Sequence, residues 1–274
     1  MKIKILFFAL FAGLIFSSSL SAAIFTWTGV VDNNWNTNGN WDLAGFPVAG
    51  DDVVIGSGSP EVNVNSAAND LTINGGTLTI NTSIVLDIAG NFLMNGGTIS
   101  STGGFGTQFR VGGSWNDVLG TVNISGFTQI FLDGTGNHEI RSNPVTNKFH
   151  FLNIENGGTY TAKSDITLSQ NTVVENASTV LDPGTNTITL DPLKTLTISN
   201  SATLQFSEAN GTVDIDGDID ASTGNITFDA VNSGILKLAA PTTTSLGTMT
   251  TGVGTVEYDF AGQQNIFNTT YNNL

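Results

Sequence analysis

The stretch that decides the fold reads LTINGGTLTINTSIVLDIAGNFLMNGGTI and covers residues 71–99. The tetrapeptide Asn-Gly-Gly-Thr occurs twice within it, at residues 74–77 and at residues 95–98. Around both copies apolar residues alternate with polar ones, and this period of two is typical of a β-strand that is buried on one face. The alternating apolar residues are Leu71, Ile73, Leu78, Ile80, Ile84, Leu86, Ile88, Phe92 and Met94.

The two Asn-Gly-Gly-Thr copies predict tight turns, because glycine and asparagine tolerate the positive φ angles that such turns require. Turns that recur after about 21 residues, with short strands between them and no helical spacing, predict a β-solenoid. We therefore expect an all-β chain in which residues 61–274 form a right-handed parallel β-helix of on the order of ten coils, roughly 50 Å long. The alternative, a pair of tandem antiparallel sandwiches, predicts no such close repeat.

The composition excludes several classes of protein. The chain has 274 residues, no cysteine and a formal net charge of −15. A charge of this sign argues against binding of nucleic acid and of anionic lipid headgroups, both of which recruit Lys and Arg. Without cysteine there is no disulfide scaffold, so stability must come from packing and from hydrogen bonds between strands. An acidic surface rich in Thr, Asn and Gly suits an extracellular protein.

The N-terminus has the pattern of a secretory signal peptide, which we place at residues 1–23. Two lysines precede an unbroken apolar run at residues 5–16, and Ser21 and Ala23 supply the small residues that a cleavage site requires. The run is shorter than the roughly 20 residues that span a bilayer, which disfavours a retained membrane anchor. We therefore expect a secreted protein, extracellular or at the outer cell surface, with no membrane insertion after cleavage.

Residues 24–60 differ from the repeats that follow, because Trp27, Trp35 and Trp41 punctuate a segment rich in Asn, Asp and Gly. The open end of a solenoid exposes unpaired strand edges and core, and bulky aromatic side chains can cover them. We interpret the segment as an N-terminal cap. The alternative is that the three tryptophans form an exposed platform that contacts glycans.

The start of this segment also resembles a known family. The resemblance rests on Phe-Thr-Trp-Thr-Gly at residues 25–29, on the steps to Trp35 and Trp41, and on residues 47–55. These features, together with the style of the repeats, resemble adhesin-like surface proteins of the Bacteroidetes. In that family a Trp-rich start leads into β-solenoid repeats, and a separate C-terminal domain directs export through the type IX secretion system. The resemblance implies a cell-surface adhesin, although no such sorting domain is visible in this sequence.

The last residues, 265–274, repeat the approach to a strand that is seen at residues 137–152 and then stop at Leu274. A solenoid that ends without a distinct capping unit leaves its core open. We therefore expect a fragment of a longer polypeptide, with further coils and an export or anchoring domain downstream.

Asp214, Asp216, Asp218 and Asp220 occupy every second position of one stretch. On a single extended strand all four carboxylates would lie on one outward face, where they repel one another. Calcium accepts several carboxylate oxygens in loose geometry, so we predict a calcium site here. The stretch lacks the glycine and the glutamate that an EF-hand loop requires. The alternative is a solvated strand face without a metal.

Both histidines lie in the segment from His138 to His150, which also holds Arg141 and Lys148. A parallel β-helix polysaccharide lyase would use such groups as a general base and to neutralise a uronate carboxylate. No carboxylate cluster stands beside the histidines in the sequence, however, and we favour a polar loop here. No motif for a nucleophile elbow, a phosphate loop, a zinc site or a dinucleotide fold occurs.

The sequence thus favours a secreted structural or adhesive β-solenoid that binds glycans or extracellular matrix through its outer faces, and for which no enzymatic activity is expected. A polysaccharide-degrading parallel β-helix enzyme, either a lyase or a glycoside hydrolase, is the alternative, and a passive stalk without a ligand is the third interpretation. A groove in which basic and acidic side chains converge would favour the enzyme. No resident cofactor is expected apart from calcium.

Overall fold

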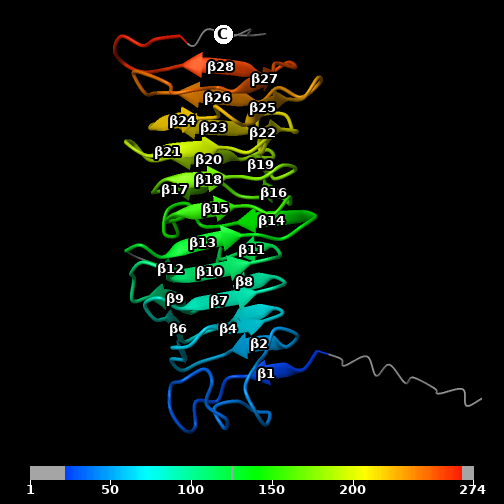
Figure 1. Cartoon of the computed structure of the whole chain (residues 1–274), viewed down its shortest axis with the longest axis vertical. Coiled ribbons are helices and arrows are strands. Elements are labelled where there is room, and N and C mark those ends of the chain that lie inside the picture. The colour runs from blue at the N-terminus through cyan, green and yellow to red at the C-terminus, as the bar shows by residue number, and fades with distance from the viewer. Residues whose placement is uncertain (1–21, 125, 267–274) are drawn as a thin grey trace, which may run out of the picture.

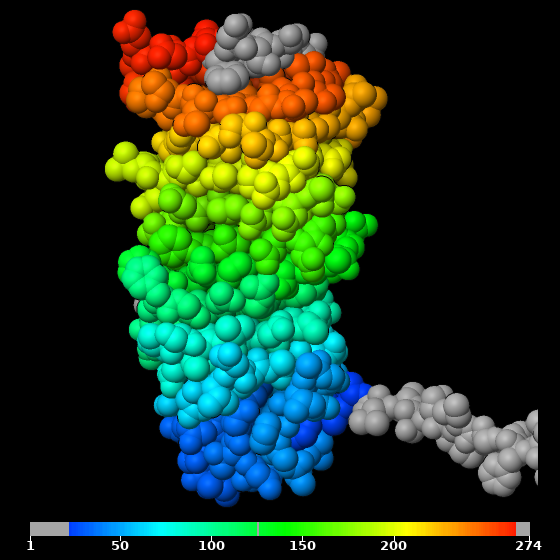
Figure 2. Space-filling view, viewed as in Figure 1, coloured from blue at the N-terminus to red at the C-terminus, as the bar shows by residue number. Residues whose placement is uncertain are grey.

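The computed structural model describes residues 22–124 and 126–266, and over this range it confirms the all-β prediction (Figure 1). Short parallel strands stack along the long axis and form a β-solenoid. The space-filling view shows an unbroken rod in which the coils follow one another in chain order (Figure 2). The described residues contain no α-helix, and therefore none that is long and apolar enough to cross a membrane. The right-handed sense of the winding stays a prediction.

Each coil has three sides, which we call walls 1, 2 and 3 in the order in which the chain passes through them. Within the described residues, wall 1 is an 11-stranded sheet that runs the whole length of the rod. Its strands, from the N-terminal end, are β1 (Ile24–Thr26), β2 (Asp52–Ile55), β5 (Leu71–Ile73), β8 (Phe92–Met94), β11 (Trp115–Asn116), β14 (Asn137–Arg141), β16 (Thr159–Ala162), β19 (Val180–Asp182), β22 (Thr203–Phe206), β25 (Asn225–Phe228) and β27 (Thr248–Thr250).

Wall 3 is also continuous, and in the part of the chain that the structure describes it is an 8-stranded sheet. Its strands are β4 (Ser66–Ala68), β7 (Val85–Ile88), β10 (Gln108–Val111), β13 (Gln129–Leu132), β15 (Leu152–Ile154), β18 (Thr172–Val174), β21 (Thr195–Ile198) and β24 (Asp218–Asp220).

Wall 2 differs from the other two walls because it is divided into two sheets. The N-terminal sheet comprises β3 (Glu61–Val62), β6 (Thr77–Ile80), β9 (Thr98–Ser101) and β12 (Thr121–Asn123). The C-terminal sheet comprises β17 (Ile166–Leu168), β20 (Thr187–Leu190), β23 (Thr212–Ile215), β26 (Ile235–Leu238) and β28 (Thr255–Tyr258).

Alternate residues of each strand point into the core, as the sequence predicts. In β5, Leu71 and Ile73 are fully buried, and they pair with Phe92 and Met94 of β8, which lie 21 residues further along the chain. This register confirms the predicted repeat. One of the alternating residues, Ile84, is only partly buried, because it lies in the corner before β7.

The two Asn-Gly-Gly-Thr copies form turns at the same corner of neighbouring coils. Gly76 and Gly97 adopt φ angles of 76° and 70°. A Cβ atom added at Gly97 would lie 2.8 Å from the backbone of Gly75 in the preceding coil. Glycine is therefore required both by the dihedral angle and by the close approach of the two turns.

The division of wall 2 falls in one coil, residues 137–154, which we call the interrupted coil. After β14 the chain crosses the wall 2 side at residues 142–149 without forming a strand. Its backbone reaches the following coil through a bridge between Phe149 and Leu168. The ladder of strands that builds wall 2 elsewhere is therefore missing on this side of the coil.

Toward the preceding coil, hydrogen bonds of one side chain replace the missing strand pairing. The Asn147 side chain is buried, and its amide donates to the carbonyl oxygens of Asp117 and Gly120 at 2.9 and 3.1 Å. The Asn147 side-chain oxygen accepts from the backbone N–H of Val122, in β12, at 3.1 Å. Three hydrogen bonds of one asparagine thus connect the two coils where no strand pairing does so.

Candidate functional site

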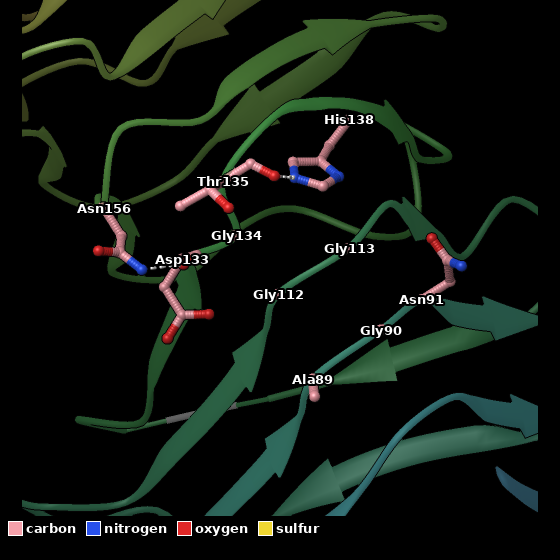
Figure 3. Close-up of a pocket in the computed structure, with 10 residues that line it drawn as sticks. All are labelled: Ala89, Gly90, Asn91, Gly112, Gly113, Asp133, Gly134, Thr135, His138 and Asn156. Carbon is pink, nitrogen blue, oxygen red and sulfur yellow. Dashed lines mark hydrogen bonds between the residues drawn. The ribbon is translucent and has the colours of Figure 1, made fainter. Parts of the chain in front are cut away.

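A groove lies at the corner where wall 3 passes into wall 1, beyond the ends of β7, β10 and β13 (Figure 3). It has a volume of about 560 Å³. We call it the corner groove, and its lining residues are Ala89, Gly90, Asn91, Gly112, Gly113, Asp133, Gly134, Thr135, His138 and Asn156. Because successive coils contribute the same turn, the groove extends across them along the axis of the rod.

Glycine forms the floor of the corner groove. A Cβ atom at Gly113 would lie 2.5 Å from the carbonyl oxygen of Gly90 in the preceding coil, and one at Gly134 would overlap the carbonyl oxygen of Gly112. The close approach of successive turns therefore excludes side chains at these positions. The floor consists of bare backbone, which a ligand can approach closely.

Arg110 neutralises the carboxylate of the groove, Asp133. The Arg110 Nε atom donates to Asp133 Oδ2 at 2.8 Å, and an Nη atom donates to Glu155 at 2.6 Å, while the guanidinium lies 4.2 Å above the Phe131 ring. Burial opposes the charge on Arg110, but the hydrogen bond to Glu155 and the charge of Asp133 raise its pKa. Burial also raises the pKa of neighbouring Asp87, and the charge of Asp133 adds to this effect.

The imidazole of the groove, His138, is held by its surroundings. Its Nε2 atom lies 3.0 Å from the carbonyl oxygen of Thr135, and its ring lies beside Tyr160, with 5.0 Å between the ring centroids. The buried Tyr160 hydroxyl accepts a hydrogen bond from the Gly134 N–H at 2.7 Å, and burial raises the pKa of this phenol. Tyr160 therefore fixes the glycine turn of the floor from inside the core.

His138 also lines a second hollow, of about 400 Å³, on the outer face of wall 1. The other lining residues are Asn137, Glu139, Thr159, Thr161, Lys163, Asp182, Gln205 and Ser207. The Asp182 carboxylate is buried there and accepts from the Gly184 N–H, at 2.8 Å, and from the Ser207 hydroxyl. The two hollows share one lining residue, His138.

The lining of the corner groove consists mainly of groups that form hydrogen bonds. It offers backbone groups, the Asn91 and Asn156 side chains, and an imidazole, whereas its carboxylate Asp133 is already paired with Arg110. Among the described residues, no group of three or more His, Cys, Asp or Glu side chains is placed to hold a metal ion. Such a lining suits a ligand with many hydroxyl groups, each of which both donates and accepts.

The four aspartates of the predicted calcium site are not on one strand, which corrects the expectation from their spacing. Asp214 belongs to β23 in wall 2, Asp218 and Asp220 belong to β24 in wall 3, and Asp216 lies in the corner between them. The chain bends at Gly217 and passes there from wall 2 to wall 3. The alternation of inward and outward residues continues through this corner, so the sequence pattern does not mark the change of direction. The outward orientation is confirmed, since all four are half-buried or exposed. The calcium itself stays a prediction.

The four carboxylates have different surroundings. Burial raises the pKa of Asp214, and the charges of Asp216 and Asp259 add to this effect, while Lys237 opposes it. Asp218 instead accepts from the Thr244 backbone N–H, at 2.9 Å, and from the Thr244 hydroxyl. Asp218 and Asp220, which accepts from the Ser222 N–H at 3.0 Å, are thus engaged by groups of their own coil or of the next one.

The three tryptophans do not form an exposed platform. Trp27, Trp35 and Trp41 are buried, with 5%, 0% and 4% of their surface exposed. The rings of Trp27 and Trp35 each pack edge-on against Trp41, with 5.0 Å between the centroids. Glycan contact through these rings is therefore excluded in this conformation, because the apolar rings gain more by packing in the end of the core.

The same segment covers strand edges at the N-terminal end. The backbone N–H of Asp42 donates to the Thr26 carbonyl at 3.0 Å, and the Thr26 N–H donates to the Asp42 side chain at 2.7 Å, so the open edge of β1 is paired. On wall 2, the backbone N–H of Trp35 donates to the Glu61 carbonyl of β3 at 2.9 Å. Wall 1 and wall 2 therefore begin with covered edges.

The two histidines lie at different corners of the coil. His138 faces the corner groove, whereas His150 lies where wall 2 passes into wall 3. Burial lowers the pKa of His150, although the charge of Asp191 opposes this, and its Nδ1 atom is buried without a hydrogen-bond partner in the structure. The structure thus does not assemble a pair of histidines, and His138 is the one that lines the corner groove.

Sequence reasoning did not find the corner groove. The signals that mark it are Gly112-Gly113 and Gly134, which occupy one corner of neighbouring coils about 22 residues apart. Comparisons of the chain with known protein families, with curated proteins and with solved structures give no match. The function is therefore argued from the groove itself.

Proposed function

We propose that this protein is a secreted or surface-exposed β-solenoid that acts as a structural or adhesive element and binds glycans in the corner groove. The observation that carries the proposal is the groove floor of bare glycine backbone, flanked by Asn91, Asn156 and His138. The signal-peptide pattern of residues 1–23, of which residues 1–21 lie outside the described residues, and the acidic, cysteine-free composition support the location.

A glycan suits the groove for two physical reasons. Amide and backbone groups offer donors and acceptors side by side, which matches hydroxyl groups on a sugar. The glycine turns also recur from coil to coil at about 4.8 Å, so bare backbone lies open over several coils, while the flanking side chains differ between the coils. Because the Asp133 charge is paired with Arg110, the groove does not repel a ligand through a free carboxylate at that position.

We further infer that residues 24–60 serve as the N-terminal cap. This proposal rests on the covered edges of β1 and β3 and on the buried tryptophans at the end of the core. A capped end prevents edge-to-edge association with a second rod, which an elongated extracellular protein must avoid. Residues 267–274, which belong to the stretch from which a longer polypeptide is expected, lie outside the described residues.

The test of the proposed function is binding of soluble oligosaccharides to the chain that follows residue 23, measured by calorimetry. His138→Ala should weaken binding at least tenfold, because it removes the side chain that both hollows share. Thr189→Ala, on the outer face of wall 2 and outside both hollows, is the matched control and should bind as the native chain does. Equal affinities for both variants would contradict the groove as the site.

The same experiment separates binding from catalysis. A polysaccharide-degrading enzyme would release new reducing ends from the bound oligosaccharide, whereas an adhesive protein leaves its length unchanged. We expect unchanged length, because His138 already faces the Thr135 carbonyl and Asp133 is engaged by Arg110, which leaves no free acid–base pair among these groups. Cleavage that is lost in His138→Ala would establish the enzyme instead.

A further inference from the structure

Three phenylalanines stack on the outside of the rod. Phe105, Phe127 and Phe151 precede β10, β13 and β15, at the corner where wall 2 passes into wall 3. The Phe105 and Phe127 rings are 4.1 Å apart at their centroids and inclined by 14°, and the Phe127 and Phe151 rings are 6.1 Å apart and inclined by 26°. We call this stack the phenylalanine ladder.

The ladder is exposed, although aromatic rings elsewhere in the chain fill the core. Phe105 has 75% of its surface exposed and Phe127 has 50%. A contiguous set of exposed apolar side chains marks an interaction site more often than a lone one does. The rings therefore require an explanation other than core packing.

The local backbone is built to present these rings. The corner between β6 and β7 spans residues 81–84, whereas the corner that carries Phe105 spans residues 102–107 and is longer. Phe151 adopts a φ angle of 40°, in the left-handed region that bulky residues avoid. Strain of this kind persists where the side chain has a role that glycine could not fill.

A hollow of about 240 Å³ lies against the ladder, and its lining residues are Phe105, Gly106, Phe127, Gln129 and Phe151. None of these residues is ionisable, although the chain carries a formal net charge of −15. The Gln129 amide is the polar side chain of the lining, and it offers both a donor and an acceptor. The ligand that matches this lining is small and neutral, with an apolar face and a hydroxyl group.

The size of the ladder argues against a protein partner. A stable protein interface buries about 800 Å² on each side. Three aromatic side chains of about 150–250 Å² each, partly covered by one another, offer well under that area. A single sugar ring, which can lay its C–H face on a phenyl ring and hydrogen-bond to an amide, fits the hollow better.

We propose that the phenylalanine ladder is a second saccharide subsite, which binds one neutral sugar ring of the glycan that occupies the corner groove. This inference rests on the proposed function. The two sites flank the outer face of wall 3, because Phe105 precedes β10 and Gly112 follows it. At about 3.3 Å for each residue of extended chain, they lie roughly 20 Å apart, so a glycan bound at both sites crosses the wall along its strands.

The test compares neutral oligomers of glucose, mannose and galactose, and oligogalacturonate, by calorimetry on the chain that follows residue 23. Phe105→Ala and Phe127→Ala should each weaken binding of neutral oligomers that are long enough to span both sites about tenfold. Leu193→Ala is the matched control, because Leu193 lies at the same corner of a later coil and is 96% exposed. The variants should melt at the native temperature, since they remove solvent-exposed rings.

The outcomes distinguish the two proposals. If His138→Ala weakens binding and both ladder variants bind as the native chain does, the ladder is not a subsite and the groove stands. If the ladder variants weaken binding and His138→Ala does not, the corner groove is wrong and the ladder stands. A preference for oligogalacturonate over all neutral oligomers would overturn the neutral class of the ladder ligand.

Discussion

The coils at residues 66–101 and the interrupted coil at residues 137–154 solve the same problem in different ways. In the first region each wall receives a strand in every coil, and neighbouring coils pair through their backbones. In the second, residues 142–149 form no strand, and the side chain of Asn147 makes the connection. Backbone pairing tolerates any outward side chain, whereas a connection made by one side chain depends on that residue.

Most of the features that could bind a ligand lie near the interrupted coil. Gly112, Gly113 and Gly134 of the groove floor, Arg110 and the phenylalanine ladder lie in the coils just before or within the interrupted coil, and the groove takes Ala89, Gly90 and Asn91 from the end of a regular coil. The coils at residues 66–101 instead present mostly Thr and Ser on wall 2, such as Thr79 and Ser100, whose hydroxyls lie 3.0 Å apart. The regular coils form the rod, and the irregular coils carry surfaces that can select a ligand.

The largest effect is expected inside a regular coil. Ile73 lies in β5, between β2 and β8, and its side chain is fully buried in the core. Ile73→Asp therefore buries a carboxylate that has no partner. The free energy of unfolding should fall by more than about 4 kcal/mol. Chemical denaturation measures this loss, and the neighbouring Thr72→Asp, which points outward, should change the value by less than about 0.5 kcal/mol. Equal losses for the two variants would disprove the inward and outward assignment.

The next effect tests the side-chain connection of the interrupted coil. Asn147→Ala removes three hydrogen bonds and takes their partner from the Val122 N–H and the Gly120 carbonyl, while the Asp117 carbonyl still accepts from the Gly120 N–H, so it should cost about 3 kcal/mol of stability. Hydrogen exchange should report the loss at the Val122 amide first. Asn123→Ala, on the exposed side of the same strand β12, is the control and should have almost no effect. Full protection of Val122 in Asn147→Ala would refute the connection.

A third effect concerns the buried carboxylate beside that connection. Asp117 is 1% exposed, accepts from the Trp115 indole N–H at 2.8 Å, and has one oxygen without a hydrogen-bond partner in the structure. Burial raises its pKa, while Ser142, Trp115 and Asn147 and the backbone of Asn143 oppose the increase. The folded state therefore binds this proton more tightly than the unfolded state does, and no charged side chain contributes to the shift.

The sign of the pH dependence follows from the raised pKa. The contribution of Asp117 to stability is complete below the unfolded pKa, about 3.9, and is lost as the pH rises through the folded pKa. Asp117→Asn should remove this loss, so the stability of the variant should gain on that of the native chain as the pH rises from acid to neutral. Denaturation across pH measures the difference. Asp32→Asn is the control with the opposite sign, because hydrogen bonds from Asn34 and Asn40 lower the pKa of Asp32.

The sequence predicted what repeats. Alternation from Leu71 to Met94 predicted the strands and, apart from Ile84, the buried residues, because each inward position meets the equivalent position of the next coil. It did not predict the position of corners, and for this reason Asp214 and Asp218 were placed on one strand although they lie on two walls. Corners depend on contacts between coils, such as the one that excludes a Cβ at Gly113, and these contacts are not visible in a single stretch of sequence.

The smallest effect is expected at the aspartates of the C-terminal coils, which are regular. Calcium binding would raise the melting temperature of chelator-treated protein, because a ligand that binds the folded state stabilises it. The corner divides Asp214 from Asp218, and the Asp218 oxygens already accept from Thr244, so we expect the predicted calcium to raise the melting temperature only slightly. Asp216→Asn, at the exposed corner, should likewise change the free energy of unfolding by less than about 0.5 kcal/mol. A large calcium-dependent rise that Asp216→Asn abolishes would show instead that the two walls share an ion across the corner, and that regular coils also carry a site.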